Sequence, residues 1–159
     1  MRTPGALAIA VLAIGGTLTG CAGGGGGGGG GTPPARPCTT TTPPSVSFSM
    51  DIQPIFNRSC ALVSCHTAPV PAQGQDLTAG VAYSQLVNVR STEQPKLERV
   101  KPGNPSNSYL VRKIEGGPNI SGVLMPNGCP SSPSSGAQCL TPDEMAAIVQ
   151  WITECAPNN

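Results

Sequence analysis

An unbroken run of glycine at residues 23–31 limits what this chain can fold into more than any other feature of its sequence. The segment that follows, residues 32–45, is rich in proline and threonine. Neither stretch can bury enough apolar surface to offset the entropy lost when a chain becomes ordered. The sequence therefore predicts a disordered tether over residues 21–46 and one small folded domain over residues 47–157.

Residues 1–20 have the order of features that is typical of a bacterial export signal. Arg2 supplies a positive charge, and residues 6–14 form an apolar run that is too short to span a bilayer as a stable helix. The residues before and at Cys21, Leu-Thr-Gly-Cys, resemble the lipobox of bacterial lipoproteins. The resemblance implies cleavage before Cys21 and lipid on its thiol, and Ala22 implies transfer to the outer membrane. We therefore expect a lipid-anchored protein of the cell envelope that faces the periplasm, with an ordinary secretory signal as the alternative.

Charge and aromatic content narrow the classes of function. Without Arg2 the mature chain has eight basic and eight acidic residues and no basic stripe, so nucleic-acid binding has no support. We interpret the mixed-charge stretch 90–101 as a solvated loop, with a docking patch for a partner as the alternative.

Only five aromatic residues are present. Because aromatics usually dominate core burial, the domain needs bulk from a buried cofactor or staples from disulfides.

Apolar residues recur at helical spacing in four segments, and no convincing strand alternation appears. Helices are predicted over residues 48–57, over residues 81–87 and after Asn107, and Trp151 flanks the apolar stripe of the last one. That last helix has an N-cap, a proline at its first position, a capping-box glutamate and a terminating proline: Thr141, Pro142, Glu144 and Pro157. The sequence predicts an all-α domain with long irregular loops.

The chemistry lies after the first helix, where Cys60 and Cys65 are followed directly by His66, the one histidine of the chain. Two cysteines with a histidine next to the second are the arrangement for covalent haem attachment. Each thiol adds to one vinyl group of the porphyrin, and the adjacent imidazole binds the iron. The motif predicts a single haem c held by Cys60, Cys65 and His66.

Residues 48–156 resemble a cytochrome c domain of the kind found in bacterial envelope proteins. The matching segments are residues 51–56, 60–66, 82–88, 99–105, 108–111, 125–126 and 144–152. The resemblance implies that Met125, which precedes Pro126, is the distal iron ligand, and that the last helix packs across the first. It also implies that the carbonyl of Pro69 accepts a hydrogen bond from the ligand histidine. Core filling is the alternative role for Met125, and Met50 and Met145 are the other methionines of the mature chain.

The cysteine spacing departs from the family pattern, because four residues separate Cys60 from Cys65 where two are usual. The porphyrin fixes the separation of the vinyl groups, so the two extra residues must bulge outward. Two alternatives remain open for this segment. One is a Cys60–Cys65 disulfide with His66 as an ordinary surface residue. The other is a zinc site on the same three residues, against which an oxidising compartment and the lack of a fourth ligand count.

Six of the seven cysteines remain once Cys21 is assigned to lipid, an even number whether or not two of them hold haem. Cys129 and Cys139 bracket a loop after the methionine, and a bridge there contributes roughly 3 kcal/mol in the chain-entropy model. Cys38 and Cys155 would then join the two ends of the domain. Four cysteines allow three pairings, and the sequence does not choose among them.

Three classes of function follow. The first is a single-haem electron carrier that exchanges electrons with other redox proteins of the envelope. The second is a haem-free structural or ligand-binding module stapled by disulfides. The third is an enzyme such as a peroxidase, against which the lack of a second haem motif, a second histidine and paired carboxylates counts. We expect the first class, and the oligomeric state stays open.

Overall fold

A computed structural model of the chain describes residues 37–130 and 136–159. The predicted export signal, the predicted lipid-bearing Cys21 and the glycine run lie outside the described residues. All of the described residues belong to one compact unit, Arg36–Asn159.

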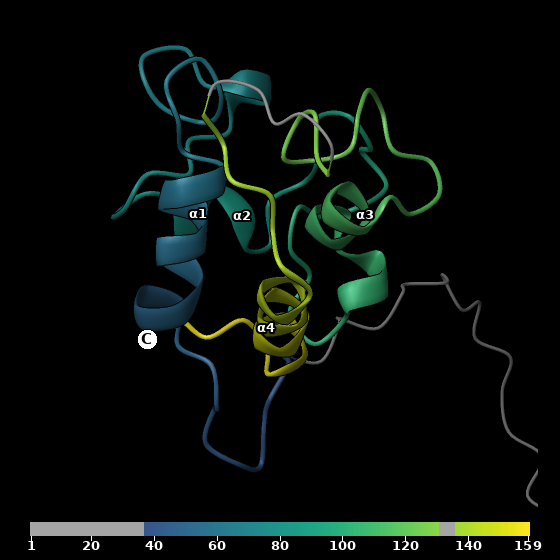
Figure 1. Ribbon diagram of the computed structural model, residues 1–159. Coiled ribbons are helices and arrows are strands. Elements are labelled where there is room, and N and C mark those ends of the chain that lie inside the picture. The colour runs from purple at the N-terminus through teal and green to yellow at the C-terminus, as the bar shows by residue number, and fades with distance from the viewer. Residues whose placement is uncertain (1–36, 131–135) are drawn as a thin grey trace, which may run out of the picture. The chain divides into compact units, whose positions relative to one another are not determined.

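Four α-helices and three short helical turns form the regular structure of the described part of the chain (Figure 1). In chain order they are η1 (Phe48–Ile52), α1 (Gln53–Ser59), η2 (Ala72–Gly74), α2 (Ala82–Leu86), η3 (Pro105–Asn107), α3 (Tyr109–Glu115) and α4 (Pro142–Thr153). Extended pairing within residues 37–130 and 136–159 is limited to three isolated backbone bridges. The predicted all-α class is confirmed.

The first helical segment begins at Ser47, whose hydroxyl accepts a hydrogen bond from the backbone N–H of Met50 at 3.2 Å. η1 is a π-helical turn that continues into α1. Pro54 is tolerated in the first turn of α1, where its missing N–H would have no helical partner. The segment buries the apolar positions that the sequence indicated: Phe48, Ile52, Ile55 and Phe56.

The start of α4 is the one the sequence predicted. Thr141 donates its backbone N–H to Glu144 at 2.9 Å and accepts the N–H of Glu144 on its hydroxyl at 3.2 Å. The helix ends at Thr153, earlier than the predicted stop at Pro157. The reason is that Cys155 and Ala156 adopt left-handed backbone angles, with φ of 70° and 46°, and turn the chain away before the proline.

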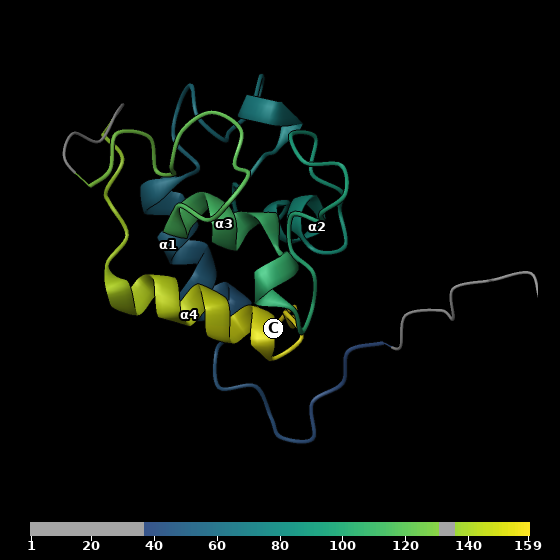
Figure 2. The same cartoon turned by 90° about the vertical axis from the view of Figure 1, so that its right-hand side faces the viewer.

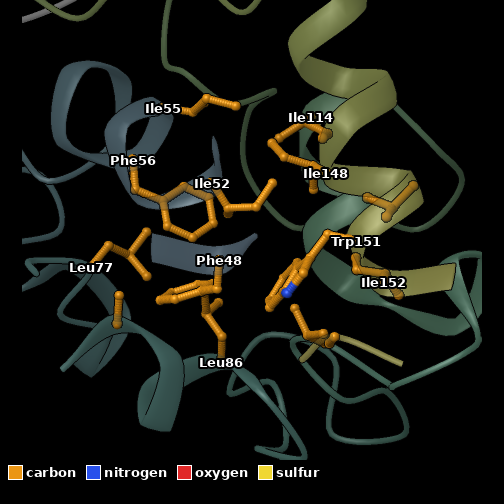
Figure 3. Close-up of a cluster of buried hydrophobic side chains, with 14 residues drawn as sticks. Phe48, Ile52, Ile55, Phe56, Leu77, Leu86, Ile114, Ile148, Trp151 and Ile152 are labelled. Carbon is orange, nitrogen blue, oxygen red and sulfur yellow. The ribbon is translucent and has the colours of Figure 1, made fainter. Parts of the chain in front are cut away.

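The core forms where α4 meets η1 and α3 (Figure 2). Figure 3 shows Trp151 of α4 beside Phe48 of η1, and their ring centroids are 5.2 Å apart. Trp151, which the sequence places at the flank of the apolar stripe, is fully buried together with Ile148 and Ile152. Its indole N–H donates to the carbonyl of Pro157 at 2.9 Å, which satisfies the polar atom of the ring inside the core.

Two disulfides close loops of very different length, with sequence separations of 117 and 10 residues. Cys38 is bonded to Cys155, and Cys129 is bonded to Cys139. The prediction of disulfides is confirmed, and this is one of the three pairings that the sequence left open. Cys38 lies in the segment that the sequence assigns to the tether, so its bond attaches the end of that segment to the turn after α4.

The interpretation of residues 90–101 as a solvated loop is wrong for its last part. Arg99 is 6% exposed and Val100 is fully buried. Backbone hydrogen bonds connect Arg99 and Val100 to the chain on either side. The N–H of Val100 donates to the carbonyl of Leu86 at 3.1 Å, and the N–H of Leu110 donates to the carbonyl of Arg99 at 3.0 Å. The segment is therefore fixed between the end of α2 and the start of α3, where its side chains turn inward.

Candidate functional site

A cavity of ≈ 300 Å³ lies among the loops that follow α1 and α3. These loops gather at the end of the domain opposite α4 in both views (Figures 1 and 2). The volume is at the lower end of the roughly 300–1,000 Å³ that small-molecule sites occupy. Its walls bring together the four predicted donors from separate segments of the chain: Cys60, Cys65, His66 and Met125.

The loop between the two cysteines folds back on itself. Cys65 N–H donates to the carbonyl of Leu62 at 2.9 Å, and His66 N–H donates to the carbonyl of Cys60 at 3.1 Å. Val63, in the middle of the loop, is 81% exposed. The additional residues of the four-residue spacing therefore bulge into solvent, while both cysteines and the histidine face the cavity.

Both thiols of this segment are free, so the alternative of a Cys60–Cys65 disulfide is not found. Burial, together with the nearby Cys65, raises the pKa of Cys60 to about 12, and Arg58 opposes the change. Cys60 is therefore a protonated thiol at neutral pH.

The hydrogen-bond partner of His66 differs from the predicted one. Its Nδ1 atom lies 3.1 Å from the carbonyl oxygen of Gln75, and Pro69 plays no such part. The reason is that the chain runs outward after His66, where Val70 is 82% exposed, and then returns. On its return Leu77 N–H donates to the carbonyl of His66 at 2.9 Å, and the carbonyl of Gln75 comes within hydrogen-bond distance of Nδ1 of the imidazole.

The surroundings of His66 favour the neutral imidazole. Burial lowers its pKa, carbonyl groups of Gln75 and Ala72 act in the opposite direction, and the charges of Lys113 and Arg99 add to the lowering. A neutral imidazole whose Nδ1 is held by a carbonyl has Nε2 left to bind a metal.

Met125 is held in the wall by its backbone. Its N–H donates to the carbonyl of Lys113, in α3, at 2.8 Å. The Cys129–Cys139 disulfide follows, and Ala137, inside the loop that it closes, is buried and lines the cavity. Among the methionines of the described residues, Met125 is the one on the cavity wall, whereas Met50 is 76% exposed.

A polar network on the same wall has no counterpart in the sequence-based prediction. Tyr109 donates its hydroxyl to Glu93 at 2.7 Å, and the Nζ atom of Lys113 lies 3.4 Å from the same carboxylate oxygen. Lys113 also donates to the carbonyl of Ser121 at 2.8 Å. Burial and the bond to Glu93 raise the pKa of Tyr109. Tyr109 and Lys113 lie four residues apart on one face of α3, as residues at this spacing do in any helix. The sequence therefore does not indicate that they belong to the site, and their burial does.

Arg99 is the second feature that the sequence did not indicate. It lines the cavity and donates from Nη1 to the carbonyl of Gln85 at 2.8 Å and from Nη2 to the carbonyl of Gln73 at 3.1 Å. It begins the matching segment 99–105, but it stands in a mixed-charge stretch with no helical period, so the sequence does not indicate that its side chain is buried. The remaining lining is largely apolar: Leu77, Leu86, Leu110, Ile114 and Ala137.

No group of three or more histidine, cysteine and acidic side chains is arranged to hold a metal ion within residues 37–130 and 136–159. No helix in those ranges combines the length and the apolar character of a membrane span.

Comparison with known proteins adds little to this picture. No protein-family model matches the chain. No curated protein matches it either. Among solved structures the chain is similar to hydrazine synthase from Kuenenia stuttgartiensis, with 27% identity and a TM-score of 0.46. The match covers 70% of this chain and 16% of that one, and at this TM-score it supports no functional argument.

Proposed function

We propose that this protein is a membrane-tethered single-haem c-type cytochrome that carries electrons in the bacterial envelope. The observation that carries the proposal is the meeting of two free thiols, a neutral imidazole and a thioether on one cavity wall: Cys60, Cys65, His66 and Met125. This donor set fits a haem c, for which two thiols form the thioether bonds and the other two groups bind the iron.

Each residue has a distinct part in the proposal. Cys60 and Cys65 fix the porphyrin edge, and the exposed loop between them absorbs the additional residues of the spacing. The carbonyl of Gln75 orients the ring of His66, as the outer partners of ligand histidines commonly do. Met125 faces the same cavity from the loop after α3. The bound haem supplies the one-electron chemistry of its iron, and the protein supplies attachment, orientation and a largely apolar enclosure.

Two disulfides support an extracytoplasmic location, because such bonds persist in oxidising compartments. We place the protein at the outer membrane, held by lipid on Cys21 and facing the periplasm. The bond at Cys38 would shorten the free part of the tether to the residues between Cys21 and Cys38. The head would then stay close to the membrane and exchange electrons with other redox proteins of the envelope.

A second candidate is a haem-free module stapled by its disulfides. The observation that favours it is a core that closes on protein side chains alone, because Phe56, Trp151 and Ile152 are at most 1% exposed. In that case the cavity would serve a ligand that is not covalently held.

The visible spectrum separates the two candidates. The full chain is produced in a bacterial host that has a haem-attachment system, beside a known c-type cytochrome as a positive control. The proposal predicts a red protein with a low-spin spectrum whose haem resists extraction with acidified organic solvent. A colourless protein, made while the control is red, contradicts the cytochrome and favours the haem-free module.

A further inference from the structure

Arg99 carries a buried positive charge at the polar side of the cavity. It is 6% exposed, and its guanidinium donates hydrogen bonds to two backbone carbonyls, those of Gln85 and Gln73. The ion pairs within the described residues are Arg58–Glu144 and Lys113–Glu93, so in that part of the chain Arg99 has no carboxylate partner. Two carbonyls use two of the five N–H donors of a guanidinium.

A buried charge without a partner is unusual, because removing an ion from water is costly unless an opposite charge compensates. The guanidinium keeps its proton even when burial lowers its pKa, so the site cannot relieve the cost by becoming neutral. The charge of Arg99 therefore indicates that something outside this chain supplies the anion.

The rest of the wall does not supply it. Lys113 is 8% exposed, and Glu93, whose side chain is 18% exposed, balances it at 3.4 Å. Of the buried or half-buried charges on the cavity wall, two are positive and one is negative: Arg99, Lys113 and Glu93. The surplus is one positive charge. Both cations line the same cavity as His66.

We propose that Arg99 binds a carboxylate of the planar molecule that occupies the cavity, and that it thereby sets which edge of that molecule points away from the two thiols. The inference rests on the proposed function, since the molecule would be a haem and the carboxylate one of its two propionates. Arginine suits this part, because its planar fork of N–H donors matches a carboxylate in two parallel hydrogen bonds.

The test uses a porphyrin that can neither react with thiols nor bind through iron. Metal-free mesoporphyrin IX has two propionates and no vinyl groups, and its dimethyl ester has the same ring without the negative charges. Both are titrated into the full chain produced without haem attachment, and binding is followed by porphyrin fluorescence. We expect the dicarboxylate to bind at least ~10-fold more tightly than the ester, as for a charge-assisted hydrogen-bonded pair.

Variants assign that preference to one residue. Arg99→Gln should remove the preference, and Arg99→Lys should keep part of it because the charge remains without the fork. Arg90→Gln is the matched control, since Arg90 is an exposed arginine of the same stretch, and it should leave the preference unchanged. Circular dichroism checks that each variant is folded.

The outcomes separate this inference from the proposed function. Equal binding of the two porphyrins by the unaltered chain, or no binding of either, overturns the inference whether or not the variants fold. A preference that persists in folded Arg99→Gln overturns it as well. If haem fails to attach in the host but the preference depends on Arg99, the cytochrome proposal fails and the carboxylate site stands.

Discussion

The Nδ1 atom of His66 lies 3.1 Å from the backbone carbonyl oxygen of Gln75. A carbonyl oxygen only accepts hydrogen bonds, so this contact requires the proton of the neutral ring to be on Nδ1. Nε2 then keeps its lone pair. One backbone contact thus selects the tautomer and orients the ring that the proposed function needs at the iron.

Replacing His66 with alanine should abolish the low-spin haem spectrum, because the iron loses its proximal ligand. The measurement is the visible spectrum of the purified variant in both oxidation states. Gln75→Ala is the matched control and should leave the spectrum unchanged, since Gln75 contributes its backbone carbonyl and not its side chain to this contact. An intact low-spin spectrum in His66→Ala would show that another residue binds the iron.

Replacing Met125 with alanine should leave the haem attached and open its distal side. The variant should bind carbon monoxide in the reduced state, whereas the unaltered protein should bind it poorly. Met50→Ala is the control, because Met50 is 76% exposed and does not line the cavity. If the iron coordination of Met125→Ala matches that of the unaltered protein, Met125 is a wall residue and not a ligand.

The two disulfides should differ in what they contribute to stability. Their sequence separations are 117 residues for Cys38–Cys155 and 10 residues for Cys129–Cys139. In the chain-entropy model these loops correspond to about 5 and about 3 kcal/mol. Urea unfolding of the two paired Cys→Ser variants should show the larger loss for Cys38 and Cys155. A larger loss for Cys129 and Cys139 would contradict this order.

The carboxylate of Glu154 should protect the protein against acid. Hydrogen bonds from Ser45, then from Gln150, lower its pKa from 4.5 to about 2. The folded state therefore holds the ionised form more strongly than the unfolded chain does. The resulting stabilisation is present above pH 4.5 and is lost as the pH falls through about 2.

Unfolding measured across this acid range tests the effect of Glu154. Glu154→Gln should show a weaker decline of stability with falling pH than the unaltered protein. Glu115→Gln is the control, since Glu115 is exposed at the end of α3. If Glu154→Gln and the unaltered protein lose stability in parallel, the hydrogen bonds to Ser45 do not contribute in solution.

Local signals in the sequence predicted the helices well. Thr141 and Glu144 specify the start of α4 by themselves, because a capping box needs only residues three apart. The apolar spacing around Phe56 likewise predicted a buried helix face. The motif at Cys60, Cys65 and His66 and the resemblance at Met125 selected four residues that the fold brings to one cavity.

The rest depends on contacts between distant segments. The carbonyl that holds His66 belongs to Gln75 because the chain makes an outward excursion and returns, and nothing in the local sequence indicates where the return occurs. Arg99 is buried because its segment is bonded to α2 on one side and to α3 on the other. The choice among disulfide pairings also needed the position of Cys38 relative to Cys155.

The central claim is that one haem is bonded to Cys60 and Cys65. Mass spectrometry of the peptide that contains both cysteines and His66, from protein made in a host with haem attachment, tests it most directly. The account predicts this peptide with the mass of one added haem, and Cys60→Ser and Cys65→Ser variants that each keep a single thioether bond. A peptide that has two free thiols or an internal disulfide, and no added haem, would contradict it.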